Sequence, residues 1–314
     1  MTNPLLSWLE QVLWPAGDRR DIWMILDGAR DRRVYSSLTS SYLDYSCLYA
    51  GDLAPALERA APHLVQLEYQ DKYSYRILER GWGDSWGVLL KADSDIKQLR
   101  RHLRHFLIAQ DTQGKRLVFR YYDPRVLRVY LPTCLEDELR TLFGPVKCFW
   151  TESQAPGEML EFSLQRGRLV ERRLRPEEPE RKPPDVFGGR IPQRYPPALT
   201  IRASQLARFS QVEREKFEDW MVVHVNRFFP RQSQSAGEDQ LRQTIRYGVE
   251  RAASHGITVK RDVCKYIDLM IVLGRDFDTD RASPWARRIL GQSASSDYKM
   301  QSLLAAAKRR LGNR

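Results

Sequence analysis

Short apolar runs alternate with amphipathic segments in the first half of the chain. The runs that have the length and composition of buried strands are Ile22–Leu26, Ser46–Tyr49, Leu64–Leu67 and Trp86–Leu90. A helix is expected around residues 32–38, and Asp52 can cap another helix with Pro55 in its first turn. Strands that alternate with helices predict an α/β arrangement for this part of the chain.

The stretch Leu99–Cys134 is expected to hold a helix, a turn, a buried strand and a second short helix. The apolar face of the first helix comprises Ile96, Leu99, Leu103, Phe106 and Leu107. Gln113-Gly114 predicts the turn, and the β-branched and aromatic residues of 117–122 predict the strand. Asp123-Pro124 begins the second helix, because a capping carboxylate followed by proline suits the first helical position.

Three further segments complete the expected first lobe. Cys148–Trp150, Met159–Leu164 and Leu169–Leu174 have the pattern of antiparallel strands. Together with the upstream pattern they predict an α+β N-terminal lobe with a mixed β-sheet over residues 1–174.

A sharp change of composition marks the expected domain boundary. Residues 175–197 hold seven of the chain's 17 prolines, with Gly188-Gly189 among alternating charges. Such a segment cannot form a helix or a central strand, because proline lacks the backbone N–H group that both need. We therefore expect a proline-rich linker at 175–197.

The pattern beyond the linker is helical and predicts an all-α C-terminal lobe over residues 198–314. Its longest helix is expected at 201–229 and should end at Pro230. The core candidates on this helix are Phe209, Val212, Trp220, Val223 and Phe228. Further helices are expected at 238–255, after Thr258, after Ser283-Pro284 and at 295–311.

The formal net charge of +11 favours an acidic partner, such as nucleic acid, an anionic membrane surface or an acidic protein. The basic residues are spread along the chain, which weakens the case for nucleic acid. No apolar run is long enough to span a bilayer. The N-terminus has no Lys or Arg before Arg19 and no cleavage site of small residues, so a secretory signal is not expected. These features predict a cytoplasmic protein without a membrane partner.

Residues that could bind a metal are scattered along the chain. Cys47, Cys134, Cys148 and Cys264 lack the paired spacing of a zinc site and are expected to be buried, reduced thiols. The histidines, which show no i, i+4 pair, are His63, His102, His105, His224 and His255. The acidic run 276–280 lacks the glycine and the glutamate of a calcium loop. The sequence therefore predicts no metal site and no cofactor.

One segment, Gly83–Gly87, matches the G-x-S-x-G pattern of a hydrolase nucleophile elbow around Ser85. That motif needs a strand before the serine and a helix after it, whereas here an apolar strand is expected to follow. A glycine-rich turn before a strand is the better interpretation. No catalytic residue is predicted, and a serine hydrolase that uses Ser85 is kept only as a remote alternative.

A group of basic and tyrosine residues in the central stretch has the composition of a protein-binding surface, because Arg and Tyr are enriched at interfaces. The expected partner-binding residues are Arg100, Arg101, Arg104, Arg120, Tyr121, Tyr122, Arg125 and Arg128. The alternative interpretation of this group is an ordinary solvated, charged face.

Several short segments between Asp21 and Pro145, together with the stretch Leu99–Cys134, follow one another in a specific order. They are Ile25–Ala29, Cys47–Gly51, Leu53–Pro55 and Ala61–Val65. In this order and spacing the first half resembles the type VI secretion effector chaperones, also called adaptors, whose shared domain was catalogued as a domain of unknown function. The matching residues to which we assign a structural role are Asp27, Gly28, Ala29, Gly51, Pro62, Asp123 and Pro124.

The resemblance implies a non-enzymatic, bacterial cytoplasmic adaptor that binds a cognate toxic effector and loads it onto the secretion spike protein VgrG. The main alternative is a nucleic-acid-binding protein that uses the basic face, although we do not expect nucleic acid as the partner. Binding by that alternative would weaken steeply with added salt.

Overall fold

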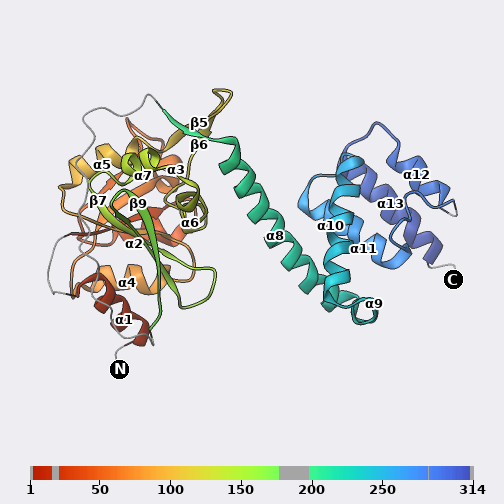
Figure 1. Cartoon of the computed structure of the whole chain (residues 1–314), viewed down its shortest axis with the longest axis horizontal. Helices are drawn as coiled ribbons and strands as arrows, with labels where there is room; N and C mark the ends of the chain where they lie inside the picture. The colour runs from red at the N-terminus through yellow and green to blue at the C-terminus, as the bar shows by residue number, and fades with distance from the viewer. Residues whose placement is uncertain (1–2, 16–20, 177–197, 282, 312–314) are drawn as a thin grey trace. The chain divides into compact units, whose positions relative to one another are not determined.

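The computed structural model describes residues 3–15, 21–176, 198–281 and 283–311 (Figure 1). Two compact units, Met1–Phe209 and Ser210–Arg314, make up the chain. Most of the linker predicted at 175–197 lies outside the described residues. Strand β10 (Leu199–Ile201) belongs to the first unit, whereas the sequence pattern predicted that the helical lobe begins at residue 198.

A seven-stranded sheet forms the centre of the first unit, in the order β2-β3-β1-β4-β7-β8-β9. The strands are β1 (Ile22–Asp27), β2 (Tyr45–Cys47), β3 (Pro62–Gln66), β4 (Gly87–Ala92), β7 (Val146–Glu152), β8 (Met159–Gln165) and β9 (Arg168–Leu174). Every pair of neighbours in this sheet is antiparallel. The predicted α+β class is confirmed, and the large sheet is antiparallel rather than mixed.

Helices cover both faces of the large sheet. They are α1 (Pro4–Leu13), α2 (Arg32–Thr39), α4 (Lys72–Gly81), α5 (Ile96–Arg104), α6 (Pro124–Tyr130) and α7 (Glu136–Phe143), whereas α3 (Pro55–Ala60) has no buried residue. Trp23 and Ile25 of β1 pack in one core with residues of α5, α6 and α7. Met24 and Leu26 pack in a second core with residues of α1, α2 and α4. Because alternate residues of a strand point to opposite faces, a strand covered on both sides needs the continuous apolar run that β1 has.

A second, smaller sheet has the strand order β10-β5-β6, and its first strand in the chain follows α5. This sheet contains both parallel and antiparallel pairs. Strands β5 (Ile108–Asp111) and β6 (Arg116–Val118) form an antiparallel hairpin, and β10 joins β5 in parallel. The turn predicted at Gln113-Gly114 is present, with Gly114 at a φ of +79°. The strand predicted at 117–122 ends at Val118, and an irregular segment follows it.

The second unit is helical, as predicted. Helix α8 (Ala203–Phe228) begins in the first unit and continues into the second. The remaining helices are α9 (Pro230–Ala236), α10 (Glu238–Ser254), α11 (Lys260–Leu273), α12 (Pro284–Leu290) and α13 (Ser296–Leu311). Pro230 ends α8 and begins α9, because proline is tolerated in the first turn of a helix. In the part of the chain that the structure describes, no helix combines the length and the apolar character needed to cross a membrane.

Candidate functional site

The three arginines of α5 that were predicted to bind a partner differ in their surroundings. Arg100 donates hydrogen bonds from Nε to the carbonyl oxygen of Cys47 (2.6 Å) and from Nη2 to that of Tyr49 (2.9 Å). Arg101 is exposed, and Arg104 is half-buried. Arg100 therefore fixes the chain after β2 to α5, and Arg101 is the member of this group that is open to solvent.

The two tyrosines of the predicted binding surface lie in the core, so that part of the prediction is wrong. Tyr121 is 0% exposed and Tyr122 is 2% exposed. The Tyr121 hydroxyl donates to the carbonyl oxygen of Leu103 (2.8 Å). Arginines interleaved with tyrosines indicate a binding surface only where the segment is exposed to solvent. Here the irregular segment after β6 buries both aromatic rings against the sheet and leaves Arg120 at the edge.

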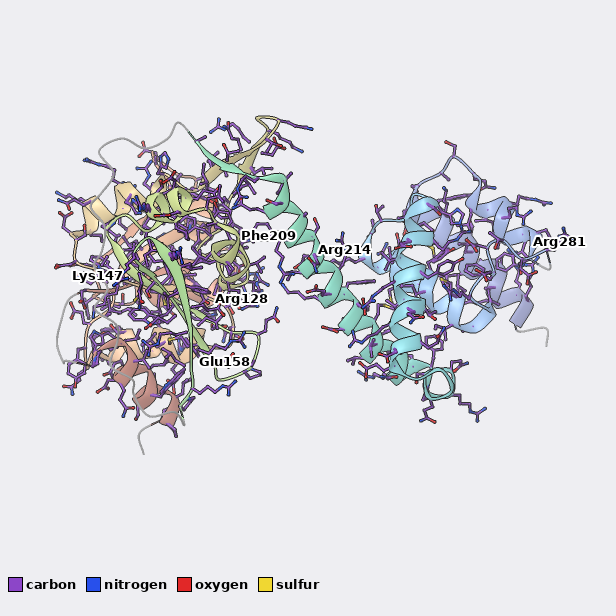
Figure 2. The ribbon with its side chains drawn as sticks, in the orientation of Figure 1. Arg128, Lys147, Glu158, Phe209, Arg214 and Arg281 are labelled. Atoms are coloured by element: carbon purple, nitrogen blue, oxygen red, sulfur yellow. The ribbon has the colours of Figure 1, made fainter. Side chains whose placement is uncertain are left out.

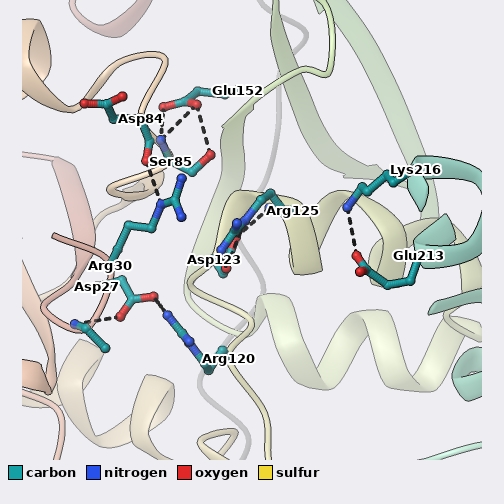
Figure 3. A network of polar contacts seen from close by, with 11 residues as sticks. Asp27, Arg30, Asp84, Ser85, Arg120, Asp123, Arg125, Glu152, Glu213 and Lys216 are labelled. Carbon is teal, nitrogen blue, oxygen red and sulfur yellow. Dashed lines mark hydrogen bonds and ion pairs between the residues drawn. The ribbon is translucent and has the colours of Figure 1, made fainter. Parts of the chain in front are cut away.

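The polar residues of this region form a cluster at the end of β1, which we call the Asp27 cluster (Figure 3). Its members are Asp27, Ser85, Arg120, Asp123, Arg125, Arg128 and Glu152. Asp27 is the last residue of β1, and its carboxylate accepts hydrogen bonds from the Ala29 backbone N–H (3.1 Å) and from Nη2 of Arg120. Burial raises the pKa of Asp27, and the Arg120 guanidinium opposes that rise.

Asp123 holds a second ion pair of the cluster. Its carboxylate caps α6 by accepting the backbone N–H of Arg125 (2.9 Å), as the sequence predicted. The same carboxylate pairs with the Arg125 guanidinium through Nε (2.9 Å) and Nη2 (2.6 Å). Although burial alone would raise it, these hydrogen bonds hold the pKa of Asp123 below its ordinary value. Arg125 is thus paired within its own helix turn.

Glu152, at the end of β7, connects the cluster to Ser85. Its carboxylate accepts from the Ser85 backbone N–H (3.2 Å) and from the Ser85 hydroxyl (3.3 Å). Burial raises the pKa of Glu152, and the hydrogen bonds from Gly83 and Ser85 oppose the rise. Arg128, labelled in Figure 2, donates from Nη1 to the carbonyl oxygen of Glu152 (2.9 Å).

Ser85 sits in a turn with a φ of +56°, which is unusual for a residue other than glycine. The chain enters β4 two residues later, so the helix that a nucleophile elbow requires does not follow. The hydrogen-bond partner of its hydroxyl is a carboxylate, whereas the elbow needs an imidazole base. The cluster joins oppositely charged side chains from segments that are distant in the sequence. Such contacts can hold the end of the sheet in one conformation.

The remaining motif residues Gly28, Pro62 and Gly51 differ in their surroundings. Gly28 donates its N–H to the carbonyl oxygen of Ala61 (3.1 Å), and a Cβ atom at Gly28 would lie 2.2 Å from the carbonyl oxygen of Arg59. Pro62 pairs with Asp27 in the register between β3 and β1. Gly51 has a φ of +80°, a conformation that glycine adopts without strain. Packing or backbone conformation therefore explains the residue found at each of these positions.

One family model matches part of the first unit. Residues 22–141 match DUF4123, a domain of unknown function. The DUF4123 region runs from the first residue of β1 into α7, so it contains Asp27, Ser85 and the arginines of α6 but ends before Glu152. No curated protein and no solved structure matches the chain.

A surface that the sequence analysis missed lies on α8. Trp220, Val223 and Phe228 were predicted to be core residues, and this is wrong: they are 52%, 66% and 59% exposed. Met221 and Val225 are buried in their place, at 0% exposure. We call Trp220, Val223 and Phe228 the apolar row. The sequence of residues 220–229 already contained a sign of this exposure. Its apolar residues occupy more positions than one face of a helix offers.

A cavity of about 480 Å³ lies beside α8, within the second unit. Phe217, Ile245 and Val263 give it an apolar lining, and its charged residues include Arg214, labelled in Figure 2, and Glu218. The Phe217 ring lies 6.1 Å from that of Trp220, between ring centroids. The second unit therefore presents an apolar row on α8 and, beside it, a cavity that α8 lines together with α10 and α11.

Proposed function

We propose that this chain is a non-enzymatic adaptor of a type VI secretion system. It binds one toxic effector in the bacterial cytoplasm and delivers it to the spike protein VgrG. The observation that carries the proposal is the DUF4123 match over residues 22–141, in the same part of the chain whose segments resemble those adaptors.

The Asp27 cluster supports a binding role rather than catalysis. Asp27 and Asp123 are each held by an arginine, and Glu152 by Ser85. These pairings hold each group in one position at the end of the sheet. The end of the sheet then offers a defined shape to a partner protein. Arg101, one of the residues that the sequence predicted to bind a partner, is an exposed charge on α5.

The apolar row supports a protein partner for the second unit. Large side chains that remain half or more exposed on a folded unit are typical of interaction sites, and Trp is enriched at binding hot spots. We assign the effector to this unit, because the DUF4123 match ends well before it and partner specificity must then come from the remainder. The DUF4123 region is left to contact the spike protein.

Nucleic-acid binding and hydrolysis by Ser85 remain the competing functions. The first loses support because Arg100, Arg120, Arg125 and Arg128 already contact carbonyl or carboxylate groups of this chain. A phosphate backbone is held by cations that are free to reach it.

The proposal is tested by a pull-down of the tagged full-length chain from its native cells, washed at low and at high salt. We expect VgrG and one toxin to co-purify and to persist in high salt. Recovery of nucleic acid alone, removed by salt, would overturn the proposal in favour of the basic-face alternative. A Ser85→Ala change that abolishes a hydrolytic activity and leaves binding intact would overturn it in favour of the hydrolase.

Variants of α8 then assign the effector to a surface. Trp220→Ala combined with Phe228→Ala should remove the toxin from the pull-down and leave VgrG. Tyr298→Ala is the matched control, because Tyr298 is an equally exposed aromatic residue (55%) on α13 of the same unit. Retention of the toxin by the α8 variant would exclude the apolar row as its binding site.

A further inference from the structure

Three side chains of the second unit have the chemistry and spacing of metal ligands. His224 extends from α8, and Cys264 and Asp268 extend from α11. We propose that His224, Cys264 and Asp268 bind a Zn²⁺ ion that links α8 to α11. The proposal goes beyond the adaptor function proposed above and does not rest on it.

The ligand atoms of the three residues already converge on one point. Nε2 of His224 lies 3.0 Å from Oδ1 of Asp268 and 3.7 Å from Sγ of Cys264. Sγ of Cys264 lies 4.0 Å from Oδ2 of Asp268. One ligand atom from each residue falls within 4.8 Å of the others. Cys264 and Asp268 are four residues apart, which places them on the same face of α11.

These separations agree with the edges of a tetrahedral zinc site. Zinc bonds of about 2.3 Å to sulfur and about 2.0–2.2 Å to nitrogen or oxygen give ligand-to-ligand distances of roughly 3.3–3.6 Å. The 3.7 Å between Sγ and Nε2 is close to that range. The 3.0 and 4.0 Å separations involve different oxygens of Asp268, and with one ligand atom per residue the separations reach up to 4.8 Å, so the carboxylate must turn to close the site. The thiol proton of Cys264 would be released on binding, and the neutral imidazole of His224 would carry its proton on Nδ1.

The donor set selects the metal. Ca²⁺ and Mg²⁺ prefer oxygen ligands, so sulfur and imidazole nitrogen bind them poorly. Zn²⁺ binds both sulfur and imidazole nitrogen well. Three protein ligands leave a fourth position for water. Solvent reaches the site, because the His224 and Asp268 side chains are 17% and 25% exposed. Both ligand-bearing elements are regular helices, which restricts the ligands to one arrangement.

No spacing in the sequence indicates this site, because its ligands come from separate helices. A paired zinc motif places ligands a few residues apart, whereas 40 residues separate His224 from Cys264. His224 also stacks between Trp220 and Phe228, at ring-centroid distances of 5.2 and 4.7 Å. These rings limit the orientations of the imidazole whose Nε2 faces Asp268.

The test uses the full-length protein, treated with a chelator and titrated with Co²⁺ as a spectroscopic substitute for Zn²⁺. We expect one equivalent to produce visible bands of tetrahedral Co²⁺ and a near-ultraviolet thiolate-to-cobalt band, both removed by Zn²⁺. Zn²⁺ should also raise the Tm by a few degrees, since a ligand bound by the folded state alone stabilises it. A wild-type protein without the thiolate band would overturn the proposal and leave an ordinary His–Asp hydrogen bond.

Variants identify the ligands. Cys264→Ser should abolish the thiolate band, and Cys47→Ser, which changes another free cysteine, should leave it unchanged. A band that persists in Cys264→Ser would also overturn the proposal. Asp268→Asn provides a second test if Cys264→Ser does not fold, because Asp268 is partly exposed. It should weaken Co²⁺ binding on the order of tenfold or more, and unchanged affinity would exclude Asp268 as a ligand.

Discussion

Asp27 and Arg120 form an ion pair between the end of β1 and the segment before α6, although 93 residues separate them. The Asp27 side chain is 1% exposed and that of Arg120 is 38% exposed. The pair therefore ties an interior strand of the sheet to a segment of irregular structure. Both residues belong to the DUF4123 region, and the remaining polar contacts of the Asp27 cluster surround them.

Removal of Arg120 should destabilise the first unit, because it leaves the Asp27 carboxylate buried without a positive partner. We expect Arg120→Ala to lower the free energy of unfolding by about 2–3 kcal/mol, less than for a fully buried pair because solvent reaches Arg120. Urea denaturation measures this loss. Arg101→Ala, at an exposed arginine, is the control and should change stability by no more than about 0.5 kcal/mol. Equal effects of the two changes would show that the pair contributes nothing.

Two motif glycines should respond differently to alanine. A Cβ atom at Gly28 would lie 2.2 Å from the Arg59 carbonyl oxygen and 2.7 Å from that of Ala61, so backbone must move. Gly51 has open space around it, and only its φ of +80° opposes a side chain. We expect Gly28→Ala to cost about 3 kcal/mol or more and Gly51→Ala about 1 kcal/mol. Thermal unfolding of the two variants under identical conditions checks the order, and a larger loss for Gly51→Ala would contradict it.

Stability should fall between pH 6.5 and pH 4 because of His102. This residue is 0% exposed, its Nε2 contacts the carbonyl oxygen of Leu142 (2.8 Å), and burial lowers its pKa from 6.5 to about 4. In that window the unfolded chain binds a proton that the folded chain does not, so the folded state loses up to about 3 kcal/mol. Urea denaturation at pH 7 and pH 5 measures the loss. His102→Gln, which cannot titrate, should show a shallower dependence on pH, and an unchanged slope would refute this assignment.

The two sides of α8 should differ in what they contribute. Met221 is 0% exposed and packs in the core of the second unit, so Met221→Ala should cost about 2–5 kcal/mol. The adjacent Trp220 is 52% exposed, so Trp220→Ala should change stability by less than about 1 kcal/mol. Thermal or urea unfolding compares the two variants directly. A large destabilisation by Trp220→Ala would show that the apolar row supports the fold rather than a partner.

The strands and most helices followed from local patterns. The run Ile22–Leu26 identified β1, and Asp123-Pro124 identified the start of α6, because strand composition and helix capping act over a few residues. β5 and β10 escaped notice, since they are only four and three residues long. The antiparallel arrangement of the large sheet also had no local signal, because pairing direction depends on how distant strands meet.

The sequence alone was sufficient for the α+β and all-α division of the chain and for the residue types that a binding surface requires. It could not decide which of those residues face solvent. Tyr121 and Trp220 are both large aromatic residues in apolar segments, yet one is buried and the other is half exposed. Likewise the approach of His224 to Cys264 and the pairing of Asp27 with Arg120 depend on how α8 packs on α11 and how the segment after β6 returns to β1. Such contacts arise from long-range packing, which local residue preferences do not encode.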